Sequence, residues 1–149
     1  MLDSANTSDV SAPEGLVKAF AAQLDAFGPE IDRGRGWIVT HRPVWGLTPV
    51  ARPGPLGSVD VGLHRTEQAA VGGRKLAGEQ MSVSGHIHHF AAYDFGPARP
   101  DQLIAGTGGD VGEPADSSSI QAGPASIDGM YAQGFAFERY GYLLLERQG

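Results

Sequence analysis

The sequence predicts an α/β fold: a mixed sheet with flanking helices, closed by antiparallel hairpins in the second half of the chain. Three observations support this prediction. An early segment has the apolar period of a helix, short apolar runs that stop at Gly or Pro are typical of strands, and two later runs flank turn residues as in a hairpin. With 149 residues, 41% of them hydrophobic, residues 1–149 have the size of one domain with one core.

The first half of the chain is predicted to contain a helix, a strand and a long loop. A capping-box spacing followed by apolar residues at helical intervals predicts a helix from Ser11 to Gly28-Pro29. The apolar, β-branched run Trp37 to Thr40 predicts a buried strand. Residues 46–62, rich in Pro and Gly, predict a long surface loop.

The second half is predicted to be mostly strands. A weak helix is expected first, since Gly72-Gly73 interrupts its apolar residues. Residues 106–130 contain Gly, Ser, Pro and Asp with little periodicity, which predicts a second long loop. In chain order, the predictions are a helix at 65–76, strands at 80–84, 89–95 and 102–105 with the last two forming a hairpin, and a closing hairpin of 134–138 with 142–146.

Composition excludes several classes of partner. Eleven Lys and Arg against seventeen Asp and Glu give a formal charge of −6, so no general field attracts nucleic acid or an anionic membrane. The longest apolar runs are far shorter than the roughly 20 residues that span a bilayer, and the start lacks the pattern of a secretory signal. Without cysteine, metal binding falls to His, Asp and Glu. Nothing in the sequence indicates a compartment.

The segment "VSGHIHHF", residues 83–90, holds three of the five histidines. If it is extended, His86 and His88 point the same way and Ile87 faces the core. Both histidines follow a predicted strand, as His41 does, and open α/β sheets bind ligands at the carboxyl ends of their strands. His41, His86 and His88 are therefore the candidate metal ligands.

The remaining motifs are expected to be structural. His64 and His89 lack a patterned partner, so we expect each to be an ordinary solvated or hydrogen-bonded side chain. The stretch Gly106 to Asp110 has the composition of a phosphate-binding loop, but no helix with a clear start follows it. A plain turn is the expectation there.

Three segments together resemble the C-terminal half of a calcineurin-like metallophosphoesterase. They are "WIVTHRPVWG" (37–46), "VSGHIHHF" (83–90) and "QLIAGTGGD" (102–110). The resemblance implies half of a four-layer α/β/β/α sandwich with two divalent ions (Zn, Mn or Fe) that hydrolyses a small-molecule phosphoester. By position in these motifs, His41 and His86 would bind one ion and His88 its neighbour.

The family's N-terminal motifs, which supply a bridging carboxylate, an Asn ligand and a catalytic His, are missing from this sequence. Imidazoles alone do not offset the charge of two ions. We therefore expect the chain to carry only the histidine part of the site, to be inactive by itself, and to self-associate or pair with a missing N-terminal half. The substrate within the phosphoester class stays open.

Three alternatives use the same histidines or none. They could surround one Zn²⁺ with an open water position. They could belong to a small β-barrel of the cupin type, although its Glu after the His-x-His pair is lacking. The chain could also be a metal-free module that packs against another chain.

Overall fold

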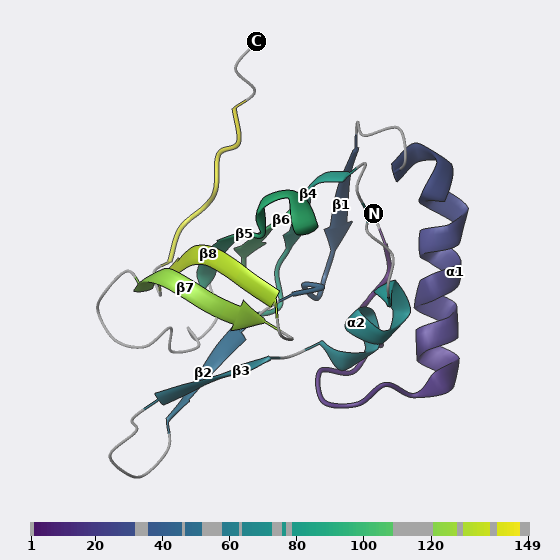
Figure 1. Ribbon diagram of the computed structural model, residues 1–149, viewed down its shortest axis with the longest axis horizontal. Helices are drawn as coiled ribbons and strands as arrows, with labels where there is room; N and C mark the ends of the chain where they lie inside the picture. Colours follow the sequence, from purple (N-terminus) through teal and green to yellow (C-terminus); the bar gives the residue numbers. More distant parts are fainter. Residues whose placement is uncertain are drawn as a thin grey trace.

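A mixed β-sheet with both α-helices on one side forms the body of the described structure (Figure 1). The computed structural model describes residues 2–31, 36–45, 47–51, 58–62, 64–72, 76, 79–108, 121–127, 130–137 and 140–146. The predicted α/β class, with a mixed sheet and helices, is confirmed. The open sheet also shows that the cupin-type barrel is wrong, because its two edge strands, β1 and β7, do not pair with each other.

Five strands in the order β1-β4-β6-β5-β8 make the sheet, and β7 is added at the edge beside β8. Strands β1, β4 and β6 are parallel, whereas β5, β8 and β7 continue the sheet through antiparallel pairs. The strands of this sheet are β1 (Gly36–Thr40), β4 (Glu79–Ser84), β5 (Phe90–Asp94), β6 (Asp101–Ala105), β7 (Gln121–Ile127) and β8 (Met130–Phe137).

Helices α1 (Glu14–Ile31) and α2 (Arg65–Val71) pack on one face of the sheet. Phe20 and Leu24 of α1 and Val71 of α2 are almost fully buried, and they share one apolar cluster with Ile38 of β1 and Ile104 of β6. Burial of these side chains supplies the main favourable free energy for docking the helices.

Both predicted helices exist, with different ends. Helix α1 continues past the predicted stop and holds Pro29 in its last turns. A proline there removes a single main-chain donor, so the helix tolerates it. Helix α2 is shorter than predicted, because Gly72 leaves helical geometry with φ of 52°. The predicted strand at 80–84 and the hairpin of 89–95 with 102–105 are confirmed as β4, β5 and β6, with a 3₁₀ turn at Gly96–Ala98.

Two predicted loops contain strands. Within 46–62, β2 (Leu47–Ala51) and β3 (Ser58–Gly62) form an antiparallel pair, so the prediction of a plain loop is wrong there. Within 106–130, β7 pairs with β8 and is likewise a correction. Because β7 is an edge strand, it accommodates Pro124, which has no N–H to donate. Residues 52–57 and 109–120 lie outside the described ranges.

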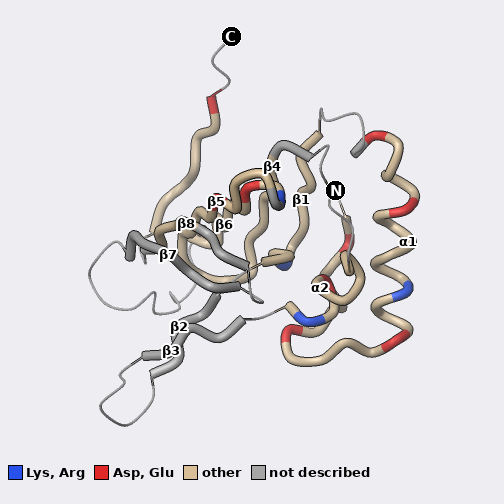
Figure 2. The backbone as a smooth tube through the Cα atoms, viewed as in Figure 1, with Lys and Arg blue, Asp and Glu red and all other residues tan. Residues whose placement is uncertain are grey.

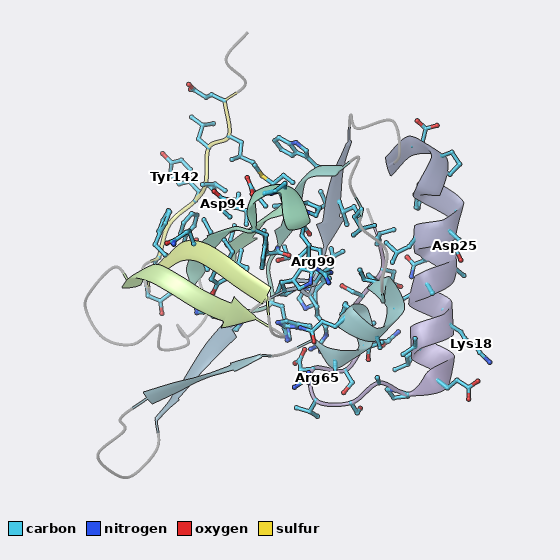
Figure 3. All side chains as sticks on the ribbon, viewed as in Figure 1. Lys18, Asp25, Arg65, Asp94, Arg99 and Tyr142 are labelled. Carbon is cyan, nitrogen blue, oxygen red and sulfur yellow. The ribbon has the colours of Figure 1, made fainter. Side chains whose placement is uncertain are left out.

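The predicted closing hairpin is wrong. Strand β8 begins earlier than expected and already has β5 on one side and β7 on the other, so no edge is left for 142–146. Residues 140–146 form no strand, and this segment points away from the sheet with Tyr142 94% exposed (Figure 3).

Neither helix packs on the other face of the sheet, which we call the uncovered face because no helix or strand in the described part of the chain lies over it. Strand registers align one apolar row across five strands: Val39, Val83, Leu103, Ala92 and Phe135. Trp37 and Val39 are 49% and 37% exposed. Strand β1 pairs with β4 on one side, and on the other side Leu2 forms a single bridge with Thr40. The prediction of a buried strand is therefore wrong for Trp37 and Val39, because only Ile38 and Thr40 face the helices.

Charged residues occur along α1, while β1 carries none (Figure 2). Within the described ranges, neither helix has the length and apolar character needed to cross a bilayer.

Candidate functional site

His41 and His86 meet where two neighbouring parallel strands end. Thr40, the last residue of β1, pairs with Ser84, the last residue of β4, so the residues that follow leave the sheet at the same edge. The amide of Gly85 donates to the carbonyl of His41 at 3.1 Å and ties the two strand ends together. The ring centroids of His41 and His86 are 5.1 Å apart in an edge-on arrangement.

The loop after β4 is not extended, contrary to the prediction. His86 has a left-handed backbone with φ of 66°, and short-range bonds join the Ile87 amide to the Gly85 carbonyl and the His89 amide to the Ile87 carbonyl, both at 2.8 Å. Ile87 is 1% exposed, so its predicted place in the core is confirmed. The turn directs His86 toward the N-terminal segment of the chain, where it meets Asp9.

Gly106 packs against residues 85–89, which we call the histidine loop, and holds it in place. Its amide donates to the His89 carbonyl at 3.2 Å. A Cβ atom at Gly106 would lie 1.8 Å from the carbonyl oxygen of Ile87, so only glycine permits this approach. The main chain of Gly106, the first residue of the glycine-rich stretch after β6, thus packs directly on the main chain of Ile87. Asp110, the last residue of that stretch, lies outside the described residues.

His88 and His89 differ in burial. His88 is partly exposed. His89 is fully buried, and burial lowers its pKa to about 4. Neither ring nitrogen of His89 has a hydrogen-bond partner among the described residues. His89 is therefore a neutral core side chain and not the solvated one expected.

Asp9 and His64 belong to the site, although no sequence pattern pointed to them. The carboxylate of Asp9 is 3.0 Å from Nδ1 of His64 through Oδ1 and 3.0 Å from Nε2 of His86 through Oδ2. His64 is fully buried at the start of α2, with a left-handed backbone, and its ring centroid lies 5.9 Å from that of His86. Its Nε2 has no partner within the described part of the chain.

The segment that carries Asp9 is held against α2 by several hydrogen bonds. The amides of Arg65 and Thr66 donate to the carbonyls of Asp9 and Ser8 at 3.2 and 3.1 Å. The Thr66 hydroxyl accepts from the Ser8 amide at 3.0 Å, and the Thr7 hydroxyl donates to the buried carboxyl of Glu67. These bonds fix Asp9 by its backbone, so its position does not depend on its own ion pair.

Arg42 completes the cluster. Its Nη1 lies 2.5 Å from Oδ1 of Asp9 and 2.7 Å from Nε2 of His86. Burial alone would raise the pKa of Asp9, but the hydrogen bonds from Arg42 and His86 outweigh it and lower that pKa to about 2. Burial lowers the pKa of His64 to about 4 in spite of Asp9, and burial followed by the charges of His86 and Arg42 lowers the pKa of His41. The cluster therefore holds an ionised carboxylate, that of Asp9, near the neutral imidazoles of His41 and His64.

The donor atoms fit a divalent cation by chemistry, because carboxylate oxygen and neutral imidazole nitrogen are ligands of Zn and related ions. As they stand in the described ranges, however, no three side chains of His, Asp, Glu or Cys have the geometry that holds a metal ion. The guanidinium of Arg42 lies between Asp9 and His86. The assignment of His41, His86 and His88 as ligands stays a prediction.

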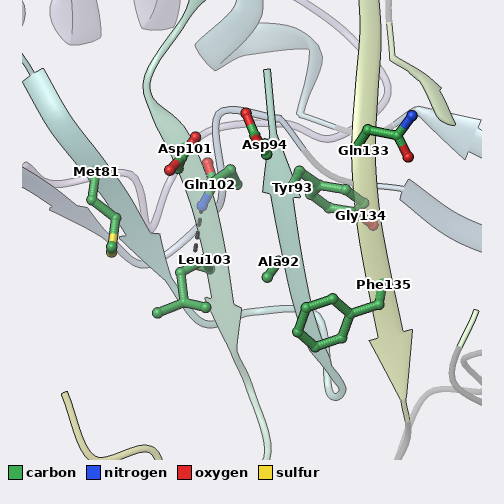
Figure 4. Close-up of a pocket in the computed structure, with 10 residues that line it drawn as sticks. All are labelled: Met81, Ala92, Tyr93, Asp94, Asp101, Gln102, Leu103, Gln133, Gly134 and Phe135. Carbon is green, nitrogen blue, oxygen red and sulfur yellow. Dashed lines mark hydrogen bonds between the residues drawn. The ribbon is translucent and has the colours of Figure 1, made fainter. Parts of the chain in front are cut away.

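A separate hollow of about 400 Å³ lies away from the histidines, on the uncovered face of the sheet (Figure 4). Met81, Leu103, Ala92 and Phe135 form much of its wall. Asp101 and Asp94 lie at one end, and burial followed by the charge of Asp94 raises the pKa of Asp101. Its wall is otherwise mostly apolar, so the hollow is part of the uncovered face.

Comparison with known proteins gives no match to this chain among protein families, curated proteins or solved structures.

Proposed function

We propose that this chain supplies histidine ligands of a metal-dependent phosphoester hydrolase, with His41 and His86 on one divalent ion and His88 on a second. The observation that carries the proposal is the approach of His41 and His86, whose ring centroids are 5.1 Å apart at the carboxyl ends of β1 and β4. Two imidazoles from distant parts of the sequence at this edge of an α/β sheet are typical of a ligand site.

The resemblance to calcineurin-like metallophosphoesterases gives the proposal its reaction class. It also gives the finer architecture, half of a four-layer α/β/β/α sandwich. The uncovered face with Val39, Leu103 and Phe135 supports that architecture, because a second sheet packed there would bury the apolar row. The partner would be a polypeptide that carries the family's N-terminal motifs, or another copy of this chain.

Bound divalent ions, Zn, Mn or Fe, would supply Lewis-acid polarisation of a phosphoryl oxygen and an activated water. The role of this chain is to bind and orient them through neutral imidazoles. The lowered pKa of His41, caused first by burial, favours that role, since a ligand histidine must be unprotonated. The substrate is a small-molecule phosphoester.

Calorimetric titration with ZnCl₂ and MnCl₂ tests the ligand set. His41→Ala, His86→Ala and His88→Ala should each weaken binding by tenfold or more, since each removes a direct ligand. Lys18→Ala, on the exposed surface of α1 (Figure 3), is the matched control and should bind as the wild type does. Wild-type affinity in all three histidine variants would refute the proposal.

The number of ions bound distinguishes the proposal from its nearest alternative. Two ions per chain at saturation support the binuclear hydrolase, whereas one tightly held ion supports a mononuclear zinc protein. Inorganic phosphate should bind the metal-loaded chain and not the metal-free chain, because the ions are its main positive charge. Equal phosphate binding with and without metal would exclude a metal-dependent phosphoesterase.

Hydrolysis by the isolated chain is expected to be low. Three imidazoles add no anionic charge to compensate two ions. The chain should therefore hydrolyse p-nitrophenyl phosphate no faster than the same concentration of free metal. Metal-dependent turnover well above that level would show that the chain holds a complete catalytic site.

A further inference from the structure

Exposed apolar side chains are concentrated in two places on this chain. Within the described ranges, all of the exposed large apolar side chains except Val10 and Phe27 lie on the uncovered face or in residues 140–146. Monomeric proteins rarely leave large contiguous apolar patches in water, so both places are candidates for contact with another surface. The first group is Trp37, Val39 and Phe135, and the second is Tyr140, Tyr142, Leu143, Leu144 and Leu145.

Residues 140–146, which we call the exposed segment, are tied to the chain that follows β6. The amide of Gly141 donates to the carbonyl of Thr107, and the hydroxyl of Thr107 donates to the carbonyl of Gly141, both at 3.2 Å. Tyr142 and Leu144 are 94% and 71% exposed, far more than the leucines on either side of Leu144. Such alternation is typical of extended chain, in which successive side chains point to opposite sides. The outward side of the segment therefore presents Tyr142 and Leu144.

The hollow on the uncovered face suits these two side chains. Its volume of about 400 Å³ lies in the range of roughly 300–1,000 Å³ that is typical of binding pockets. Ala92 and Leu103 belong to its apolar wall, and Asp94 and Asp101 lie at one end (Figure 4). A tyrosine side chain needs this combination, because its ring is apolar and its hydroxyl donates a hydrogen bond, which a carboxylate accepts.

A second copy of the chain is the occupant that uses both surfaces. The exposed segment begins beside Thr107, after the end of β6, whereas Asp101 and Leu103 place the hollow at the start of β6. From Gly141 the segment leaves the body of the protein on the side away from α1 (Figure 1), so it is directed toward a neighbouring molecule and not back over its own hollow. In a pair related by a two-fold axis, each copy donates its segment and receives that of the other, so both apolar surfaces of both copies are buried.

We propose that the uncovered face is a homodimer interface in which Tyr142 and Leu144 of each copy fill the hollow of the other. The hydroxyl of Tyr142 donates to the carboxylates at the end of the hollow. This inference goes beyond the proposed function, which leaves the partner of the uncovered face open. It uses none of the histidines, so the metal titrations and the oligomeric state test the two proposals independently.

Sedimentation equilibrium of the full chain tests the dimer. Tyr142→Ala should raise the Kd of the dimer tenfold or more, because buried aromatic side chains carry much of the binding free energy of an interface. Tyr142→Phe keeps the ring and loses the hydroxyl, so it should raise the Kd about fivefold. Since Tyr142 is 94% exposed, neither change disturbs the core. Val10→Ala, also exposed but outside the sheet, is the control and should leave the Kd unchanged. A monomeric wild type, or a wild-type Kd in Tyr142→Ala, would overturn the inference.

Disulfide trapping shows which chain supplies the segment in the hollow. The chain has no cysteine, so Ala92→Cys in the hollow and Leu144→Cys in the segment introduce its only thiols. A mixture of the two singly substituted chains should give a cross-linked heterodimer on oxidation, whereas Val10→Cys mixed with Leu144→Cys should not. Absence of that heterodimer would overturn the inference. So would a doubly substituted chain that forms only an intramolecular disulfide, because the segment would then cover its own face.

Discussion

Replacing Gly106 by alanine tests how the histidine loop is held. The added Cβ would lie 1.8 Å from the carbonyl oxygen and 2.7 Å from the carbonyl carbon of Ile87. Ordinary carbon–oxygen contacts are about 3.3 Å or longer, so the two backbones must separate by roughly 1.5 Å. Both clashing atoms are main chain, and no side chain can rotate away to relieve them.

The expected cost follows from that displacement. Overpacking of a filled interior destabilises by about 1–3 kcal/mol, and weakening the bond from the Gly106 amide to the His89 carbonyl, 3.2 Å long, adds about 1 kcal/mol. We expect Gly106→Ala to lower the free energy of unfolding by about 3 kcal/mol. For a chain of this size the melting temperature should fall by about 10 °C.

The assay is urea unfolding followed by circular dichroism, together with the Zn²⁺ titration. Gly108→Ala is the matched control, since nothing lies within 4 Å of the added Cβ there. Because the shift moves the loop that carries His86 and His88, Zn²⁺ affinity should fall about tenfold in Gly106→Ala and stay unchanged in Gly108→Ala. A Gly106→Ala protein as stable as the wild type would refute the close approach on which the site geometry rests.

Two further predictions concern a buried acid and the uncovered face. Burial raises the pKa of Glu67, so in the folded protein Glu67 keeps a proton that it loses in the unfolded chain once the pH rises above 4.5. This difference destabilises the wild type at pH 7, so Glu67→Gln should be more stable than the wild type in urea at pH 7 and no more stable near pH 4. Glu14→Gln, on the exposed surface of α1, should show no such trend. Val39→Lys should lower the average molecular mass that sedimentation gives for a concentrated sample, because it places a charge in the apolar row. Val10→Lys, also exposed but outside the sheet, should leave that mass unchanged. A wild type that is monomeric at the same concentration would refute self-association through this face.

Local sequence pattern predicted the elements whose own residues show β-branched runs, alternation or turn residues. Strands β1 and β4 are β-branched or alternating runs that end at a glycine or before a proline, and the β5–β6 hairpin has turn residues between two such runs. The β2–β3 pair and β7 were missed because their residues show little periodicity and become strands through partners elsewhere in the chain. Residues 142–146 show the converse: they are an apolar run, but both edges of β8, their predicted partner, are already paired with β5 and β7.

The candidate site likewise contains residues that the sequence pattern predicts and one that it does not. His41 and His86 could be predicted to meet because each follows a strand, and the carboxyl ends of neighbouring parallel strands converge whatever the intervening sequence. Asp9 has no such marker: it lies in a segment without secondary structure, and its bonds reach His64 and His86 across long stretches of chain. Only the docking of residues 7–9 on α2, through main-chain amides common to every sequence, brings its carboxylate there.

The different ways in which the histidines and Asp9 are held determine how each should respond to mutation. The strand-borne histidines are held by the sheet, so substituting one should leave the other in place and reduce metal affinity by its own share. Asp9 is held in part by the Thr66 hydroxyl, which accepts from the Ser8 amide. Thr66→Val should therefore lower the free energy of unfolding by about 1 kcal/mol in the urea assay, because the Ser8 amide loses its partner. The contact between Asp9 and His86 thus depends on the sheet on one side and on the segment bonded to α2 on the other.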